Sequence, residues 1–235
     1  MGNSWFQFQQ FRIHQDRCAM KISTDAVLLG SLANAENPNQ ILDIGTGTGV
    51  IALMLAQRFP ESKVTAVEID PDAAEQAKEN FQESKFSQRL EIFHGRIQDL
   101  PEKEKFDLIV SNPPFFPEHL KSKDSKRNKA LHTDELSFEE LINKTIQLLS
   151  STGVFWVILP PRQMQDLELL AQKSGLYLFQ KVRVKDQEDK PVHREIGGFE
   201  FQVRDKKEEI LILKDQKLAY SSSYSSLLSG FLLGY

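Results

Sequence analysis

The residues best suited to chemistry are Asn112, Pro113, Pro114 and Phe115, which directly follow the apolar run 106–111. A proline after Asn112 pushes its backbone into an extended conformation, and the second proline stiffens the turn. The side-chain oxygen of Asn112 and the carbonyl of Pro113 could accept the two hydrogens of a planar amine. Phe115 could stack on the ring that carries this amine, a contact worth about 1–3 kcal/mol for a base. The four residues predict a site that directs an amine lone pair towards an electrophile.

The same residues could instead form an ordinary Asn-Pro turn after a strand, because such turns are common. The position of Asn112 favours function: it follows a buried central strand, on the sheet edge where a glycine-rich loop also lies. Ligands of open α/β sheets bind at the carboxyl ends of the strands.

The glycine-rich loop contains Gly45, Thr46, Gly47 and Gly49. A glycine turn between a strand and a helix lets the backbone approach a ligand closely and directs helix amides towards it. Glu68 ends the next apolar run, at about the distance where an acid binds ribose hydroxyls. We therefore predict a nucleoside cofactor here, although the glycines could merely shape a tight turn.

Spacing and charge distinguish two possible cofactors. Dinucleotide-binding folds have the pattern G-x-G-x-x-G, whereas these glycines occupy alternate positions. Asp43, two residues before Gly45, would repel a pyrophosphate but could pair with the ammonium of an amino-acid moiety. The loop therefore favours S-adenosyl-L-methionine over NAD, and methyl transfer over nicotinamide redox chemistry.

Strand and helix signals alternate along most of the chain, which predicts an α/β fold with a mostly parallel sheet covered on both faces. Pro71 is typical of a first helical turn, and Ser137 with Glu140 forms a capping-box pattern. The last strands lack intervening helices, so we expect one antiparallel strand at or near the sheet edge. Strands are expected over 40–45, 63–68, 89–94, 106–111, 153–159, 176–184, 196–203 and 208–213, and helices over 25–34, 49–59, 71–83, 137–150 and 162–174.

The length of 235 residues fits one domain. Three segments lie outside the alternation: 1–38, with a short helix; the loop 113–136; and the tail 216–235. No apolar run is long enough to cross a bilayer, and the first residues lack the basic-then-apolar pattern of a signal peptide, so we expect none. Cys18 has no partner for an internal disulfide, which favours a cytoplasmic location. Five scattered histidines and one cysteine offer no metal-ligand spacing, so we expect no metal.

With these motifs, the chain resembles the Rossmann-like S-adenosylmethionine-dependent methyltransferases of the Asn-Pro-Pro-aromatic group, which act on adenine N6, guanine N2 or glutamine N5. Two further motifs point to a narrower family. One is the block 11–30, which contains the pairs Met-Lys and Thr-Asp followed by Leu-Leu-Gly, and the other is the tail motif Tyr220-Ser-x-x-Tyr224. They are similar to the tRNA1(Val) (adenine(37)-N6)-methyltransferase family. The resemblance implies a class I fold with a seven-stranded sheet and methylation of adenine 37 in the anticodon loop. It also implies that Lys21, Thr24, Asp25, Ile69 and Ile97 lie beside the cofactor with Asn112.

Two positions depart from that group. Phe115 stands where the family more often has tyrosine, so stacking is retained and a hydroxyl is lost. Arg96 stands where the wider group has an aspartate near the cofactor adenine, a place that Asp99 could fill. Thr24 or Asp25 could also serve simply as a helix cap.

A basic loop follows the amine site, and its charges could hold RNA phosphates. They could equally form a solvated surface, and the net charge of −4 argues against indiscriminate nucleic-acid binding. We expect a monomer acting on tRNA, with ribosomal RNA or a protein glutamine as the alternative substrate and a non-catalytic RNA-binding protein as another class. The RNA-binding candidates are Lys121, Lys123, Lys126, Arg127, Lys129, His132 and Arg194.

Overall fold

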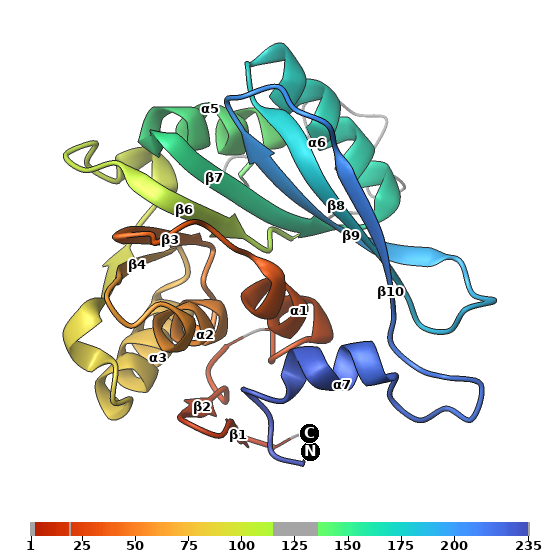
Figure 1. The fold of residues 1–235 in the computed structure, drawn as a ribbon. Helices are drawn as coiled ribbons and strands as arrows, with labels where there is room; N and C mark the ends of the chain where they lie inside the picture. Colours follow the sequence, from red (N-terminus) through yellow and green to blue (C-terminus); the bar gives the residue numbers. More distant parts are fainter. Residues whose placement is uncertain (1–2, 19, 115–135, 235) are drawn as a thin grey trace, which may run out of the picture.

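The computed structural model describes residues 3–18, 20–114 and 136–234. Its centre is a sheet in the order β10-β8-β9-β7-β6-β3-β4-β5, in which β9 alone among these eight runs opposite to the others (Figure 1). The strands are β3 (Gln40–Ile44), β4 (Lys63–Glu68), β5 (Leu90–His94), β6 (Phe106–Ser111), β7 (Leu149–Leu159), β8 (Tyr177–Lys185), β9 (Val192–Glu200) and β10 (Lys207–Ile212).

Helices cover both faces of the sheet (Figure 1). Each face has one buried apolar cluster, in which the side chains of its helices pack against those of the strands. One face carries α1 (Thr24–Leu32), α2 (Val50–Arg58), α3 (Pro71–Glu83) and α7 (Ser222–Leu228). The other carries α5 (Phe138–Leu148) and α6 (Pro161–Lys173), and the short 3-10 helices are η1 (Ser87–Arg89) and η2 (Ile97–Asp99). Within the described ranges, no helix is long and apolar enough to cross a membrane.

The predicted Rossmann-like architecture is confirmed, with eight strands in the sheet where the family resemblance implies seven. The reversed strand is β9, which pairs antiparallel with β7 and β8 and lies third from the edge. The eighth strand is β10, which matches the strand expected over 208–213, pairs in parallel with β8 and forms the edge of the sheet.

Local sequence signals explain the helix boundaries. The Asp70 side chain accepts a hydrogen bond from the Ala73 amide at 2.8 Å, and Pro71 opens α3. The predicted capping box of α5 is confirmed: Ser137 Oγ accepts from the Glu140 amide, and the Glu140 carboxylate accepts from the Ser137 amide. Each cap satisfies amides that the helix itself leaves without partners.

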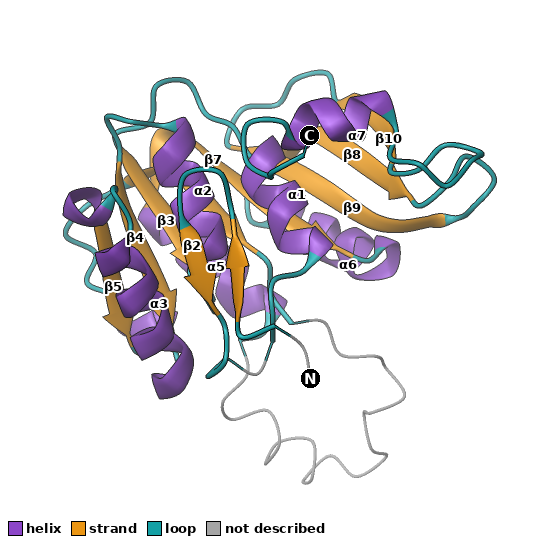
Figure 2. Ribbon diagram, turned by 90° about the horizontal axis from the view of Figure 1, so that it is seen from below, coloured by secondary structure: helices purple, strands orange, loops and turns teal. Residues whose placement is uncertain are grey.

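The segment before α1 forms an antiparallel hairpin of β1 (Trp5–Gln7) and β2 (Arg12–His14), which the sequence did not predict. The Phe8 and Phe11 rings between these strands are buried and stack at 4.5 Å. The tail reaches the same place, because the Gln9 amide donates to the Phe231 carbonyl at 2.8 Å and Phe8 forms a β-bridge with Leu232. The turn of the hairpin therefore lies against the C-terminal segment around residues 231–232, and Figures 1 and 2 show the arrangement of the elements from two sides.

Candidate active site

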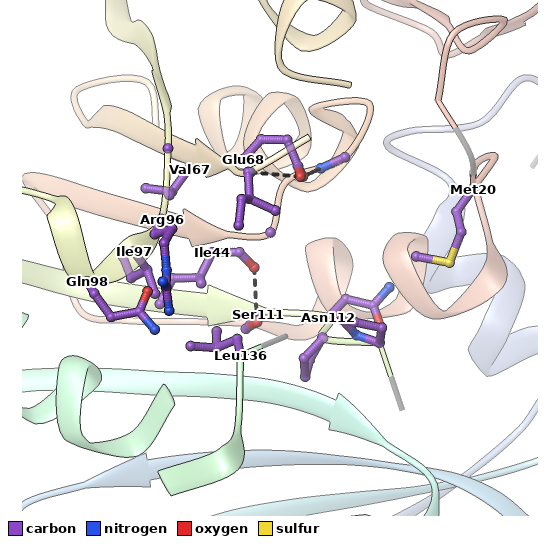
Figure 3. Close-up of a pocket in the computed structure, with 16 residues that line it drawn as sticks. Met20, Ile44, Val67, Glu68, Arg96, Ile97, Gln98, Ser111, Asn112 and Leu136 are labelled. Atoms are coloured by element: carbon purple, nitrogen blue, oxygen red, sulfur yellow. Dashed lines mark hydrogen bonds between the residues drawn. The ribbon is translucent and has the colours of Figure 1, made fainter. Parts of the chain in front are cut away.

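A cavity of about 250 Å³ opens at the carboxyl ends of β3, β4 and β6 (Figure 3). From β3 the chain proceeds to β4 on one side, and β6 lies on the other, so the cavity lies at the point where the strand order reverses. Open α/β sheets bind ligands at this point. The cavity is lined by Met20, Ile44, Gly45, Gly47, Val67, Glu68, Ile69, Gly95, Arg96, Ile97, Gln98, Ser111, Asn112, Pro113, Pro114 and Leu136.

Gly45 and Gly47 form the floor of the cavity between β3 and α2. Both have positive φ, 72° and 55°, which side-chain-bearing residues rarely adopt. A Cβ built on either glycine meets no atom within 4 Å. The two glycines thus keep open a space beside the backbone, as a close-fitting ligand requires.

Gly49 serves a different purpose and does not line the cavity. It precedes α2 with φ of 82°, and a Cβ there would lie 2.5 Å from Cε1 of Phe81 on α3. Its small size therefore lets α2 begin against α3.

A Gly49→Ala substitution is expected to destabilise the fold through both backbone strain and the overlap with Phe81. Gly175→Ala is the matched control, because Gly175 also has positive φ, of 85°, but has open space around it. Chemical denaturation should show Gly49→Ala to be the more destabilising by about 1–3 kcal/mol, the usual cost of overpacking. Equal losses would show that the Phe81 ring moves aside freely.

Glu68 ends β4, and its buried carboxylate organises the loop (Figure 3). One oxygen accepts from the Gly47 amide at 2.8 Å, and the other accepts from the Ile69 and Asp70 amides at 2.9 and 3.0 Å. A carboxylate has about four acceptor sites. Glu68 therefore retains capacity for a hydroxyl donor from a ligand in the cavity.

Asp43 lies beneath the loop, is fully buried and does not line the cavity. Its Oδ2 accepts from Thr46 Oγ1 at 2.6 Å and from the Ala52 amide at 3.1 Å. Its Oδ1 has no hydrogen-bond partner among the described atoms. Burial raises the pKa of Asp43 to about 7, against the lowering effect of these two hydrogen bonds. Asp43 and Thr46 thus fasten the loop to α2, and direct contact with a ligand ammonium stays a prediction.

Asn112, Pro113 and Pro114 line the cavity opposite the glycine loop, as Figure 3 shows for the Asn112 side chain. Asn112 is half-buried. The adjacent Ser111 hydroxyl donates to the Ile44 carbonyl at 3.0 Å, which fixes the end of β6 to β3. The predicted Phe115, Lys121, Lys123, Lys126, Arg127, Lys129 and His132 lie outside the described residues.

The block 11–30 contributes Met20 to the lining of the cavity. The predicted cofactor residues Lys21, Thr24 and Asp25 are not part of this lining. Lys21 Nζ donates to the Asn3 carbonyl at 3.3 Å. Ser23, one residue before the predicted caps, is the N-cap of α1, and Thr24 is exposed. Asp25 pairs at 2.6 Å with Arg194 of β9, which joins a predicted cofactor residue to a predicted RNA residue.

Several lining residues were missed by sequence reasoning. Ile44 and Val67 could have been found, because they lie at the carboxyl ends of predicted strands. Gln98 lines the cavity and donates to Glu140 at 3.2 Å, whereas Asp99 is exposed and outside the lining. Arg96 does line the cavity. Met20 and Leu136 lie in irregular segments, where no periodic signal marks them.

Cys18 lies near the cavity and is buried. Desolvation raises the pKa of its thiol to about 11, and the negative charges of Glu68 and Asp70 add to the effect. The thiol therefore stays protonated at neutral pH and is a poor nucleophile. Across the described ranges, no group of three or more His, Cys, Asp or Glu side chains could hold a metal ion.

Comparison with known proteins agrees with this geometry. Residues 20–190 match the family model described as methyltransferase small domain. A solved structure described as a predicted O-methyltransferase from Agrobacterium tumefaciens superposes with a TM-score of 0.68 at 22% identity, covering 88% of this chain and 96% of that one. The chain therefore has a Rossmann-like methyltransferase fold.

Curated relatives define the family more narrowly. A protein from Pedobacter heparinus is 44% identical over 98% of both chains, and one from Bacteroides fragilis is 42% identical over 99% of both. Both are described as tRNA1(Val) (adenine(37)-N6)-methyltransferase. The chain belongs to this family.

Proposed function

We propose that the protein transfers a methyl group from S-adenosyl-L-methionine to N6 of adenine 37 in tRNA1(Val). The observation that carries the proposal is that one cavity brings together the glycine floor, the Glu68 carboxylate and the Asn112-Pro113-Pro114 turn. These groups have the chemistry to bind a nucleoside cofactor on one side and an amine on the other.

The residues of the cavity fit S-adenosyl-L-methionine. The open space beside Gly45 and Gly47 accommodates the methionine part, and Glu68 accepts from ribose hydroxyls. Ile69 and Ile97 provide apolar contacts for adenine, with Arg96 and Gln98 at the rim. When bound, the cofactor supplies an electrophilic methyl group on a sulfonium.

The Asn112 side-chain oxygen and the Pro113 carbonyl accept the two hydrogens of the adenine N6 amine. This pairing orients the nitrogen lone pair into the cavity, and no side chain has to remove a proton before transfer. The methyl–sulfur bond would break as the nitrogen–carbon bond forms, leaving S-adenosyl-L-homocysteine, and the methylated nitrogen would then lose one proton to solvent. Alignment of the amine in a water-poor site provides the remaining rate enhancement. Phe115 stacks on the target base.

Family membership supports the RNA substrate, because the relatives are described as acting on adenine 37 of tRNA1(Val). An anticodon-loop base is unpaired, so moving it into a pocket costs less than extracting a base from a duplex. We assign Lys21, Thr24 and Asp25 to the cofactor side of the site. Arg194 and the basic loop 121–132 are assigned to binding of RNA phosphates. The enzyme acts in the cytoplasm as a monomer without a metal.

The test is methyl transfer from labelled S-adenosyl-L-methionine to unmodified transcripts of valine tRNA, ribosomal RNA and a protein glutamine substrate. Nucleoside mass spectrometry should find N6-methyladenosine at position 37 of the valine tRNA. Replacement of that adenine by guanine is the control and should abolish the product. Label found only in ribosomal RNA or protein would overturn the substrate assignment and keep the amine chemistry.

A further inference from the structure

The outer face of the β1–β2 hairpin carries an exposed aromatic residue with a cation stacked on it. The Trp5 side chain is 44% exposed, and the guanidinium carbon of Arg12 lies 4.5 Å from the centre of its ring. The strand register pairs Trp5 with His14 and Gln7 with Arg12. Because side chains alternate along strands, these four share one face, which we call the Trp5–Arg12 face.

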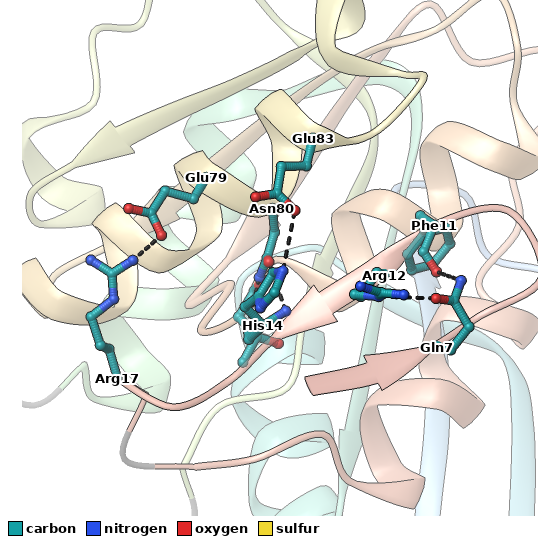
Figure 4. Close-up of polar contacts among 9 residues, drawn as sticks. Gln7, Phe11, Arg12, His14, Arg17, Glu79, Asn80 and Glu83 are labelled. Carbon is teal, nitrogen blue, oxygen red and sulfur yellow. Dashed lines mark hydrogen bonds and ion pairs between the residues drawn. The ribbon is translucent and has the colours of Figure 1, made fainter. Parts of the chain in front are cut away.

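This face is held firmly on the body of the protein (Figure 4). The fully buried Asn80 of α3 accepts from the His14 amide at 2.8 Å and donates to the His14 carbonyl at 2.9 Å. Glu83 pairs with His14 at 3.1 Å, and Glu79 pairs with Arg17. The hairpin is therefore a fixed platform, and the nearby carboxylates are each opposed by a basic group.

Hydrogen bonds next to this face link the open end of the hairpin to the segment that reaches the cavity. The Gln15 amide donates to the Ser4 carbonyl at 2.8 Å, and Gln15 Nε2 donates to the Asn3 carbonyl at 3.0 Å. The same Asn3 carbonyl accepts from Lys21 Nζ. Lys21 follows Met20, which lines the cavity. The Trp5–His14 end of this face is thus connected, through its chain neighbours, to the segment that lines the cavity.

The chemistry of the face fits an unpaired nucleotide. An aromatic ring and a guanidinium plane are the groups on which unstacked bases stack, and a guanidinium also binds phosphate. Within the described structure, Arg12 contacts neutral groups, the Trp5 ring and the Gln7 side-chain oxygen at 3.0 Å. The face offers stacking and hydrogen-bonding groups in place of a continuous apolar area, which favours a nucleotide over a protein partner.

We propose that the Trp5–Arg12 face binds an unpaired nucleotide of the RNA substrate adjoining the target adenine, with its base stacked on Trp5 and its phosphate near Arg12. This inference rests on the proposed function, because it assumes a single-stranded RNA loop as the substrate. It assigns the hairpin a positioning role that is separate from the amine site at Asn112.

Tryptophan fluorescence tests the stacking directly. The chain has two tryptophans, and Trp156 is 2% exposed and donates to the Asn34 carbonyl at 2.8 Å. Titration with an unmodified valine tRNA anticodon stem-loop should therefore quench Trp5. Trp5→Phe should abolish the quenching and keep affinity close to wild type. Trp5→Ala should raise Kd and KM for the stem-loop about 5- to 100-fold, with kcat and the Kd for S-adenosyl-L-methionine unchanged.

Arg204→Ala is the matched control for Arg12→Ala. Arg204 also stacks on an aromatic ring, 4.4 Å from the centre of Phe179, but near the amino end of β8, away from the cavity. Arg12→Ala should weaken stem-loop binding and reduce its salt dependence, whereas Arg204→Ala should not. Two outcomes would overturn this inference alone. In one, the wild type methylates the stem-loop normally but its fluorescence is not quenched. In the other, a folded Trp5→Ala protein methylates the stem-loop normally and binds it with unchanged Kd. Failure of the wild type to bind or methylate the stem-loop would overturn the proposed function with it.

Discussion

Replacement of Asn112 by Ala is expected to lower kcat by about 100- to 1000-fold, the loss typical when one preorganised polar group is removed from an active site. The side-chain oxygen of Asn112 is assigned to one hydrogen of the amine, so its loss leaves the nitrogen misdirected. Affinity for S-adenosyl-L-methionine should change little, because most of the contacts proposed for the cofactor come from other lining residues, among them Gly45, Gly47 and Glu68.

Single-turnover methyl transfer and calorimetric cofactor titration would separate these effects. Asn112→Asp retains an acceptor oxygen at the same position and should keep more activity than Asn112→Ala. Asn34→Ala is the control, because Asn34 is exposed and lies outside the cavity lining. An unchanged kcat in Asn112→Ala would refute the assignment of Asn112 to the amine.

The second large effect is expected at Asp43, whose substitution by Asn should change how stability depends on pH. Burial raises the Asp43 pKa from 3.8 to about 7 in the folded protein. A folded state that holds this proton more tightly loses stability as pH rises from about 4 to about 7, and the loss is complete above the folded pKa. A shift of this size corresponds to about 4 kcal/mol. Asp43→Asn removes the titration and with it this loss.

Urea denaturation at pH 5 and pH 8 would measure the effect. The stability of Asp43→Asn relative to wild type, measured as the free energy of unfolding, should be higher at pH 8 than at pH 5. Asp72→Asn removes an exposed carboxylate in the first turn of α3 and controls for the change in net charge. The same pH dependence in wild type and Asp43→Asn would show that water or a ligand solvates the buried Oδ1.

Much of the fold follows from local sequence signals. The helix predicted over 71–83 matches α3, because an aspartate cap and a first-turn proline fix its start. Buried strands such as β6 were found because their apolar runs are continuous. The β1–β2 hairpin could not be found in this way, since each strand has three residues and its burial depends on the distant tail.

The lining of the candidate site was predictable where it follows from strand ends and only partly elsewhere. The sequence places Glu68 at the end of one apolar run and Asn112 directly after another, and the topology brings both into one cavity. Their roles in catalysis stay predictions. Asp43 and Gly49 belong to the predicted cofactor motif, but the structure places both behind the glycine loop and outside the cavity lining. Pattern gives the identity of a loop residue, whereas the direction of its side chain depends on packing with α2 and α3.

The contact between the hairpin turn and the tail has a consequence for synthesis on the ribosome. Gln9 bonds to the Ser229 and Leu232 carbonyls across separations of 220 and 223 residues. A two-stranded hairpin is marginally stable alone, and domains fold progressively as the chain emerges. The sheet can thus assemble first, whereas the hairpin is stabilised only when residues 228–232 are available to pack against it. The segment leading from the hairpin to Met20 at the cavity mouth is therefore secured late, after translation has passed the tail.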